Sequence, residues 1–201
     1  MSLKSLSKKL REKIETYRLY SSMTNLAPIA RRYFIIGYFD GALTILGLIM
    51  GAHLSRKATP EVVISAGVAT AIALGISSGW GAYEAERVEQ TAVKIERDKA
   101  MLRSVGGIVE RAHSFAILVS SLVHAVSPVI ASLIPLVFYV FLPVDEAFPF
   151  AIATGLLQLF VVGAFMGKVS RGGILRSGLR LVLAGIVTLA IVLLLSPSHL
   201  M

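Results

Sequence analysis

The chain has 201 residues, 55% of them hydrophobic, and its mean hydropathy is +0.75. A soluble domain of this length would be less apolar, so the composition predicts an integral membrane protein with one membrane domain. The sequence contains no cysteine, which excludes disulfides, thiolate metal sites and thiol catalysis. The net charge of +8 does not indicate nucleic-acid binding, because the basic residues cluster between apolar spans, as membrane topology requires.

Residues 1–30 predict a cytoplasmic segment ahead of the membrane domain. Apolar residues recur there at helical spacing, and lysine and arginine cover the rest of the helix surface; the apolar positions are Leu3, Leu6, Leu10, Ile14 and Tyr17. This pattern is typical of a basic amphipathic helix that lies on a membrane surface. A charged tail that only fixes orientation is the alternative, and both can hold together. A break is predicted at residues 25–28, which end in a proline.

The first predicted span, Tyr33–Ala52, is apolar over a full bilayer width but contains one acid, Asp40. A carboxylate at that depth is costly and is a functional-site candidate by default. The alternative is that Asp40 lies near a helix end and meets headgroup water. Arg31 and Arg32 lie about 12 Å away along the helix axis, at 1.5 Å per residue, which places Asp40 below the interface.

Glycines flank this acid in two small-xxx-small pairs, Gly37 with Gly41 and Gly47 with Gly51. Such pairs remove side-chain bulk and let another helix backbone come close. Ordinary glycine enrichment in membrane helices is the alternative. The two pairs around one acid favour a tightly packed helix with a charged group in its seam.

The second predicted span, Val62–Ala82, is rich in small residues and continues beyond the membrane. From Tyr83 to Arg103 the sequence stays favourable for helix but becomes charged, and Gly106-Gly107 is expected to end it. The sequence therefore predicts one long helix that projects into the cytoplasm.

Three further spans are predicted at residues 114–142, 150–167 and 179–195, joined by a far-side turn, LPVDEAFP, and a basic near-side turn, KVSRGGILRSGLR. The third contains Pro128 and Pro135, which predict a kink. The predicted fold is an all-α integral membrane protein: a five-helix domain over 31–201 with a cytoplasmic helical extension at 84–113.

Eighteen basic residues fall on the N-terminal side of the membrane and two, Arg56 and Lys57, on the other, which places the N-terminus in the cytoplasm.

The extension carries acids that suggest a metal site. Glu86, Glu89 and Glu96 share one helix face, and Glu110 and His113 form the Glu-x-x-His spacing of carboxylate-bridged iron and manganese sites. Oxygen and imidazole ligands suit Fe²⁺ or Mn²⁺. Because basic residues are interleaved with these acids, a solvated face with ion pairs is the alternative.

Two polar residues lie inside later spans. His124 could relay protons or could hydrogen-bond a neighbouring backbone carbonyl, and the sequence favours neither. Gln158 is interpreted as a contact between helices rather than a ligand. No nucleophile motif or phosphate-binding loop occurs, so the protein is not expected to be an enzyme, and any transport should be driven by a gradient.

Four stretches resemble the vacuolar iron transporter (VIT) family over roughly residues 31–195. In the first span Arg32, Gly37, Asp40-Gly41 and Gly51 follow the family pattern. The others are GISSGWGAYEAERVEQ, SLIPLVFYV and RSGLRLVLAGIVTLAIVLLL. The resemblance implies five membrane helices, a dimer, and export of Fe²⁺ or Mn²⁺ from the cytoplasm in exchange for protons.

The resemblance also has gaps. Where the family has a methionine and a Gly-Glu in the second helix, this chain has Ser78 and Gly81-Ala82, and Glu84 follows two residues later, about 200° around the helix. The cytoplasmic segment is also shorter than in the family's iron-transporting members. These departures identify the chain as a divergent member of the family.

The function predicted from the sequence is proton-coupled export of a divalent metal, in a homodimer whose two Asp40 side chains face a shared path. The expected path residues are Asp40, Gly41, Thr44, Ser78 and Glu84. The expected metal ligands are Asp40, Glu86, Glu89, Glu96, Glu110 and His113, with His124 as the candidate proton relay. The metal is expected as cargo, without a covalent cofactor, and the other partners are membrane lipids. A non-transporting membrane scaffold of the same fold is the alternative. Short loops and the absence of a signal-like start favour a prokaryotic plasma membrane.

Overall fold

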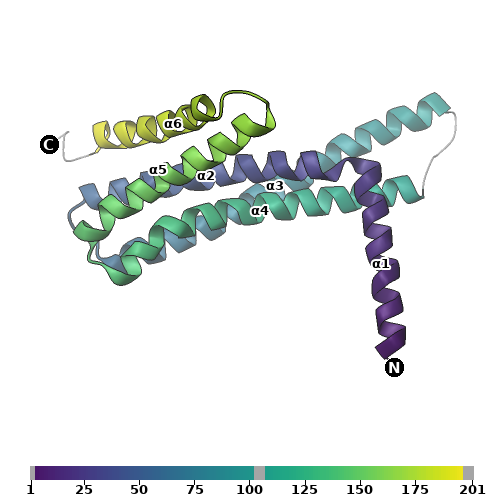
Figure 1. The fold of residues 1–201 in the computed structure, drawn as a ribbon, viewed down its shortest axis with the longest axis horizontal. Helices are drawn as coiled ribbons and strands as arrows, with labels where there is room; N and C mark the ends of the chain where they lie inside the picture. The colour runs from purple at the N-terminus through teal and green to yellow at the C-terminus, as the bar shows by residue number, and fades with distance from the viewer. Residues whose placement is uncertain (1–2, 102–106, 197–201) are drawn as a thin grey trace. The chain divides into compact units, whose positions relative to one another are not determined.

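The computed structural model describes residues 3–101 and 107–196, and six α-helices account for most of them (Figure 1). Their bounds are α1 Leu3–Thr24, α2 Leu26–Leu54, α3 Pro60–Met101, α4 Ile108–Phe141, α5 Val144–Val169 and α6 Ile174–Leu194. The described residues contain no β-strand. Helices α2 to α6 are each long and apolar enough to cross a membrane, which confirms the all-α fold with five candidate spans.

Helix α3 confirms the predicted extension of the second span. It is one continuous helix of 42 residues, apolar in its first half and charged in its second. Its charged half contains no glycine or proline after Gly81, so nothing in the sequence interrupts the helix. The predicted end at Gly106 lies outside the described residues. Gly107, which precedes α4, has φ of +111°, a conformation that favours glycine.

Several helices begin earlier than the sequence predicted. The predicted break at residues 25–28 is confined to Asn25, which has φ of +49°, because Pro28 in the first turn of α2 needs no helical hydrogen bond for its missing N–H. The predicted turn LPVDEAFP is mostly helical, since Asp145 and Glu146 lie in the first turn of α5, where the helix dipole stabilises acids. Likewise, α6 begins at Ile174 and shortens the predicted basic turn.

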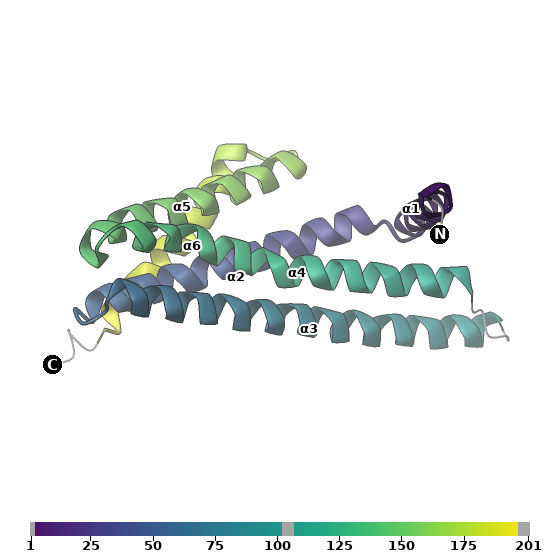
Figure 2. The same ribbon diagram turned by 90° about the horizontal axis from the view of Figure 1, so that it is seen from below.

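The described chain divides into two compact units, and each is treated separately. The first unit is Met1–Phe34 with Ser78–His124. In it, α1 crosses the beginning of α4 (Figure 1), where the ring of Tyr17 stacks on Phe115 at 4.9 Å and Tyr20 lies 5.9 Å from the same ring. The charged half of α3 runs antiparallel to the beginning of α4 (Figure 2). The amphipathic N-terminal segment is therefore a helix, as predicted.

The second unit, Ile35–Ser77 with Ala125–Met201, contains the apolar core. Helix α2 contributes to both buried clusters, which also contain side chains from α3, α4 and α5. One cluster comprises Ile45, Ile49, Val63, Leu136, Tyr139, Ala147 and Ala151. The other comprises Tyr38, Ala42, Leu46, Ala131, Leu159 and Val162. Helix α6 packs on α5 through small residues: Gly163 lies directly against the α6 backbone at Ser177.

The outward faces of the spans are apolar. Large aliphatic side chains on α4 and α6 are exposed at helical spacing, among them Val126, Ile130, Val137, Leu175, Leu179, Leu183 and Ile186. A surface of this kind suits the hydrocarbon of a bilayer, where helices satisfy their own backbone hydrogen bonds. The packing therefore agrees with an integral membrane protein.

Candidate functional site

Asp40 lies in the middle of α2 in the second unit and is half-buried. The next residue, Gly41, is buried against α4: a Cβ at Gly41 would lie 2.3 Å from the carbonyl oxygen of Pro128. The Ser132 hydroxyl also donates a hydrogen bond to the Gly41 carbonyl oxygen at 3.1 Å. The backbone that carries Asp40 is therefore held directly against α4, and the glycine makes that approach possible.

A second link joins α2 to α4 and α5. The Tyr38 hydroxyl donates to Gln158 Oε1 at 3.0 Å, and Gln158 Nε2 donates to the Ala131 carbonyl oxygen at 3.1 Å. Pro135 explains why this carbonyl needs a partner, because proline has no N–H to donate to the residue four positions earlier. Gln158 thus joins three helices, and the interpretation of this amide as an interhelical contact is confirmed.

The face of α2 that carries Asp40 is lined by small residues. Gly37, Thr44, Gly47 and Gly51 lie three, four, seven and eleven positions from Asp40, so all five share one side of the helix. Thr44 and Gly47 are half-buried, and a Cβ at Gly51 would have no neighbour within 4 Å among the described residues. Gly37 is buried, a Cβ at Gly47 would lie 3.9 Å from Thr188 and Val192 of α6, and Gly41 meets α4, so these close approaches within one chain do not argue for a seam between two chains.

Glu86, a predicted metal ligand, accepts hydrogen bonds in the first unit. It receives the Tyr33 hydroxyl at 2.7 Å, and Arg32 Nη2 lies 3.7 Å from the same oxygen. Only 17% of the Glu86 side chain is exposed, so this acid is held between α2 and α3 rather than on the solvated face. No local pattern predicts the pairing of Tyr33 or Arg32 with Glu86, since 53 positions separate the tyrosine from the glutamate.

His124, the candidate proton relay, contacts the same part of α2. Its Nδ1 lies 2.9 Å from the Tyr33 carbonyl oxygen, and the two rings lie 5.1 Å apart. Because a carbonyl oxygen only accepts, this geometry assigns the proton to Nδ1. The backbone hydrogen bond that the sequence left open is therefore present, and the relay role stays a prediction.

The remaining predicted ligands lie in the hairpin formed by residues 84–101 of α3 and 107–117 of α4, here termed the extension hairpin. Glu84 accepts two hydrogen bonds from Arg87, at 2.7 and 3.0 Å. Glu110 pairs with Lys94 of α3, and this contact raises the pKa of the Lys94 ammonium. His113 Nδ1 is bonded to the Val109 carbonyl oxygen at 2.9 Å.

The other two acids, Glu89 and Glu96, are exposed. Among the described residues, no three histidine or acidic side chains lie close enough together to hold one ion. Ser78 is half-buried in α3, and Ala82, which replaces the family's glutamate, is buried. In the extension hairpin Glu84 and Glu110 are therefore paired with basic side chains, His113 is bonded to a backbone carbonyl, and metal ligation by these residues stays a prediction.

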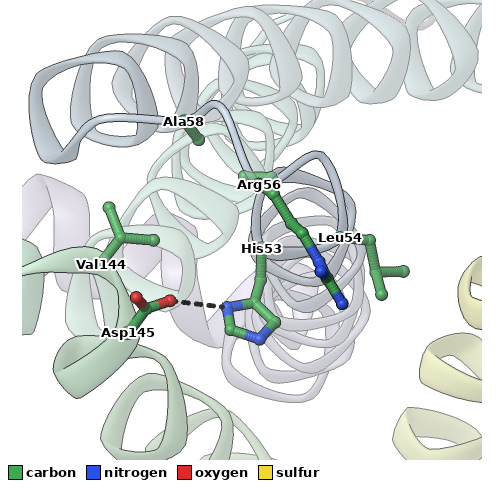
Figure 3. A pocket seen from close by; sticks show the side chains of 7 residues that line it. His53, Leu54, Arg56, Ala58, Val144 and Asp145 are labelled. Carbon is green, nitrogen blue, oxygen red and sulfur yellow. Dashed lines mark ion pairs between the residues drawn. The ribbon is translucent and has the colours of Figure 1, made fainter. Parts of the chain in front are cut away.

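Two polar cavities accompany these residues, one in each unit. In the extension hairpin, a cavity of about 120 Å³ is lined by Arg87, Gln90, Thr91, Lys94, Arg97, Glu110, His113, Ser114 and Ile117. In the second unit, a cavity of about 430 Å³ lies at the end of α2 and the beginning of α5 (Figure 3).

In the larger cavity, His53 Nδ1 lies 3.8 Å from Asp145 Oδ1 (Figure 3). The His53 ring also stacks on Phe148, with the ring centroids 3.8 Å apart. Asp145 has 93% of its side chain exposed, and Arg56 lines the same space. His53 therefore joins the end of α2 to the beginning of α5.

These features define a class before any comparison is made: a helical membrane protein whose first span holds a half-buried acid beside a glycine-mediated helix contact. Comparison with known proteins agrees with this. The sequence matches the VIT family over residues 31–104 and 84–196. The chain therefore belongs to the VIT family, as its resemblance predicted, and membership points to a membrane transporter of metal ions.

The chain is also similar to an archaeal protein. It is 32% identical over 164 residues to the uncharacterized protein MJ0645 of Methanocaldococcus jannaschii, and the match covers 80% of this chain and 84% of the relative. The similarity is consistent with a prokaryotic source for the present chain.

Proposed function

We propose that this protein carries a divalent metal cation, Fe²⁺ or Mn²⁺, out of the cytoplasm in exchange for protons. The observation that supports this most is Asp40, the sole acid in the sequence of α2, half-buried in an apolar span of a VIT-family protein. An ionisable side chain at that depth of a membrane span is costly to bury and marks a functional site.

Asp40 and its neighbours suit an oxygen-ligated cation. The Asp40 carboxylate would bind the ion, and the Thr44 hydroxyl lies one turn away on the same face. Carboxylate and hydroxyl oxygens suit Mn²⁺ and similar ions, and the chain offers no thiolate that would favour softer metals. Gly41 would act indirectly, because its contact with α4 fixes the helix that carries Asp40.

A dimer would complete this site. A second copy would bring its own Asp40 close to the first; on the face of α2 that carries Asp40, a Cβ at Gly51 would meet nothing within 4 Å among the described residues, whereas Gly47 already faces Thr188 and Val192 of α6. Two neighbouring carboxylates favour the state in which they share one proton over the state in which both are charged, because like charges repel. A divalent cation that enters would displace the shared proton, and this exchange would couple the two fluxes.

The polar groups of the first unit would serve the path on the cytoplasmic side. Ser78 and Glu84 of α3 would line it, and the exposed Glu89 and Glu96 would attract cations from solution. Glu86, Glu110 and His113 could join them by exchanging their present partners for the ion. His124 would pass protons through the ring nitrogen opposite Nδ1. A prokaryotic plasma membrane is the proposed location.

The test is transport by purified protein reconstituted in liposomes with an imposed pH gradient. External Mn²⁺ or Fe²⁺ should accumulate in vesicles in which the cytoplasmic face of the protein points outward, and a pH indicator should report proton release in the opposite direction. Metal accumulation that does not change with the pH gradient would contradict proton coupling but would still support metal transport.

A scaffold of the same fold is the second candidate, and the replacement of the family's second-helix ligands by Ser78 and Ala82 favours it. A scaffold should bind no Mn²⁺ or Fe²⁺ stoichiometrically in calorimetry and should give no flux. Saturable binding together with flux would exclude it.

A further inference from the structure

The smaller cavity, in the extension hairpin, is lined by more positive than negative side chains. Arg87, Lys94 and Arg97 contribute cations from α3, and Glu110 of α4 is the carboxylate in the lining. Since three cations face one acid, the cavity suits an anion better than a metal ion. Of the residues that line this cavity, only Glu110 and His113 belong to the proposed cation path.

The three basic side chains differ in how far their charge is neutralised. Arg87 is paired with Glu84 through two hydrogen bonds, and Lys94 with Glu110. Arg97 has no ion pair within the described part of the chain, and its Nε is buried there without a hydrogen-bond partner. A buried donor that lacks a partner is uncommon and calls for one, so Arg97 is the group in the cavity that most needs an acceptor.

The surrounding polar groups are arranged around these cations. The Thr91 hydroxyl donates to the Arg87 carbonyl oxygen and the Ser114 hydroxyl to the Glu110 carbonyl oxygen, which fixes both side chains. Gln90 adds an amide to the same lining. The cavity is therefore built from positioned polar groups on two helices.

We propose that this cavity binds a phosphate group, with the Arg97 guanidinium as its principal contact and Lys94 and Arg87 as supporting charges. A guanidinium presents several N–H donors in a planar fork that matches phosphate oxygens, and such charge-assisted bonds are the strong ones. A volume of about 120 Å³ is well below the range of about 300–1,000 Å³ used for drug-sized ligands, so one phosphate group, such as one end of pyrophosphate, fits inside and a whole nucleotide does not.

The phosphate could belong to a soluble phosphorylated molecule or to a lipid headgroup. Lys94 lies twelve residues beyond Ala82, where the second span is predicted to end, or about 18 Å along a helix. The site therefore favours a soluble anion. Binding would tie α3 to α4 in the hairpin.

The test is calorimetric titration of the full-length protein in detergent with pyrophosphate. Saturable binding is expected, and Arg97→Gln should weaken it about tenfold or more, as loss of a charge-assisted contact does. Arg111→Gln is the matched control: it removes the same charge from an exposed position of the hairpin that does not line the cavity, so it should change the affinity less than about twofold. If both variants weaken pyrophosphate binding equally, the binding reflects general charge attraction, and the proposed site would be wrong.

A third variant separates the anion site from a metal site and does not depend on removing an arginine. Glu110→Gln removes the carboxylate from the lining, so it should tighten pyrophosphate binding severalfold. If Glu110 belongs to a metal site instead, wild-type protein should bind Mn²⁺ at this position, Glu110→Gln should lose that binding, and pyrophosphate affinity should not rise. That pattern would contradict the proposal.

Lipid nanodiscs distinguish the two sources of phosphate. With a soluble ligand, pyrophosphate affinity should be the same in phosphatidylcholine discs and in discs that contain phosphatidic acid. With a lipid ligand, phosphatidic acid should compete with pyrophosphate in wild type but not in Arg97→Gln. Failure of wild-type protein to bind either phosphate form would overturn the proposal, and metal transport would remain a separate question.

Discussion

The contact between Gly41 and Pro128 makes a sharp prediction, because it reverses the usual effect of a glycine-to-alanine change. Alanine in a helix is normally more favourable than glycine by about 0.5–1 kcal/mol. At Gly41, however, the added Cβ would lie 2.3 Å from the Pro128 carbonyl oxygen and 2.6 Å from its Cα, whereas ordinary contacts begin near 3.4 Å. Helices α2 and α4 would have to separate by about 1 Å.

The magnitude follows from this separation. Overpacking of a well-packed core costs about 1–3 kcal/mol, and the hydrogen bond from Ser132 to the Gly41 carbonyl, at 3.1 Å, would be stretched as well. For a chain of this size, about 2–4 °C of melting temperature is lost per kcal/mol, so Gly41→Ala should melt about 2–12 °C lower in detergent. Transport should also fall, because Asp40 moves with the backbone.

Gly81→Ala is the control, because a Cβ at this position of α3 meets nothing within 4 Å among the described residues and Gly81 lies outside the proposed dimer face. It should melt at or slightly above the wild-type temperature, which fluorescence of the single tryptophan can follow. Equal melting temperatures for the two variants would refute the claim that α2 and α4 are in backbone contact at this point.

Three other predictions follow from single contacts. Gln158→Leu should lower stability by about 1–3 kcal/mol in chemical denaturation, because it leaves the buried Ala131 carbonyl without its side-chain donor. Gly163→Ala should cost about 1–3 kcal/mol in the same assay, since the Cβ would lie 2.6 Å from an α6 carbonyl oxygen. Glu110 raises the pKa of Lys94, so the stability from this pair should be complete below the ordinary lysine pKa of about 10.4 and lost as pH rises through the higher folded value. Spin-label distances across the extension hairpin should therefore broaden as pH rises above the ordinary lysine pKa of about 10.4, and this pH effect should be absent in Lys94→Met.

The sequence predicted the helices better than their contacts. Long apolar runs identified the five spans, and the absence of helix breakers between Tyr83 and Met101 predicted the extension of α3. The errors lay at helix starts, where Pro28 and Asp145 read as breakers but are compatible with a first turn. Proline and aspartate occur both in turns and in the first turn of a helix, so local sequence alone does not distinguish the two positions.

Several partners of the candidate site residues could not be predicted from the sequence, because they lie on other helices. The Glu-x-x-His spacing at Glu110 and His113 suggested a metal site, but in the structure Glu110 pairs with Lys94, which lies sixteen positions earlier on another helix. The glycine at 41 predicted a close helix approach correctly, whereas its partner Pro128 depended on how the chain folds back. Such pairings depend on how two helices are aligned with each other, and the residue pattern of one helix does not predict that alignment.

The central claim is that the carboxylate of Asp40 binds the transported metal. Mn²⁺ flux into liposomes should be compared for wild type, Asp40→Asn and Asp145→Asn, the last removing an acid whose side chain is 93% exposed. Asp40→Asn should abolish flux, Asp145→Asn should retain it, and both proteins should melt like wild type. Wild-type flux in Asp40→Asn would show that the Asp40 carboxylate does not bind the transported metal.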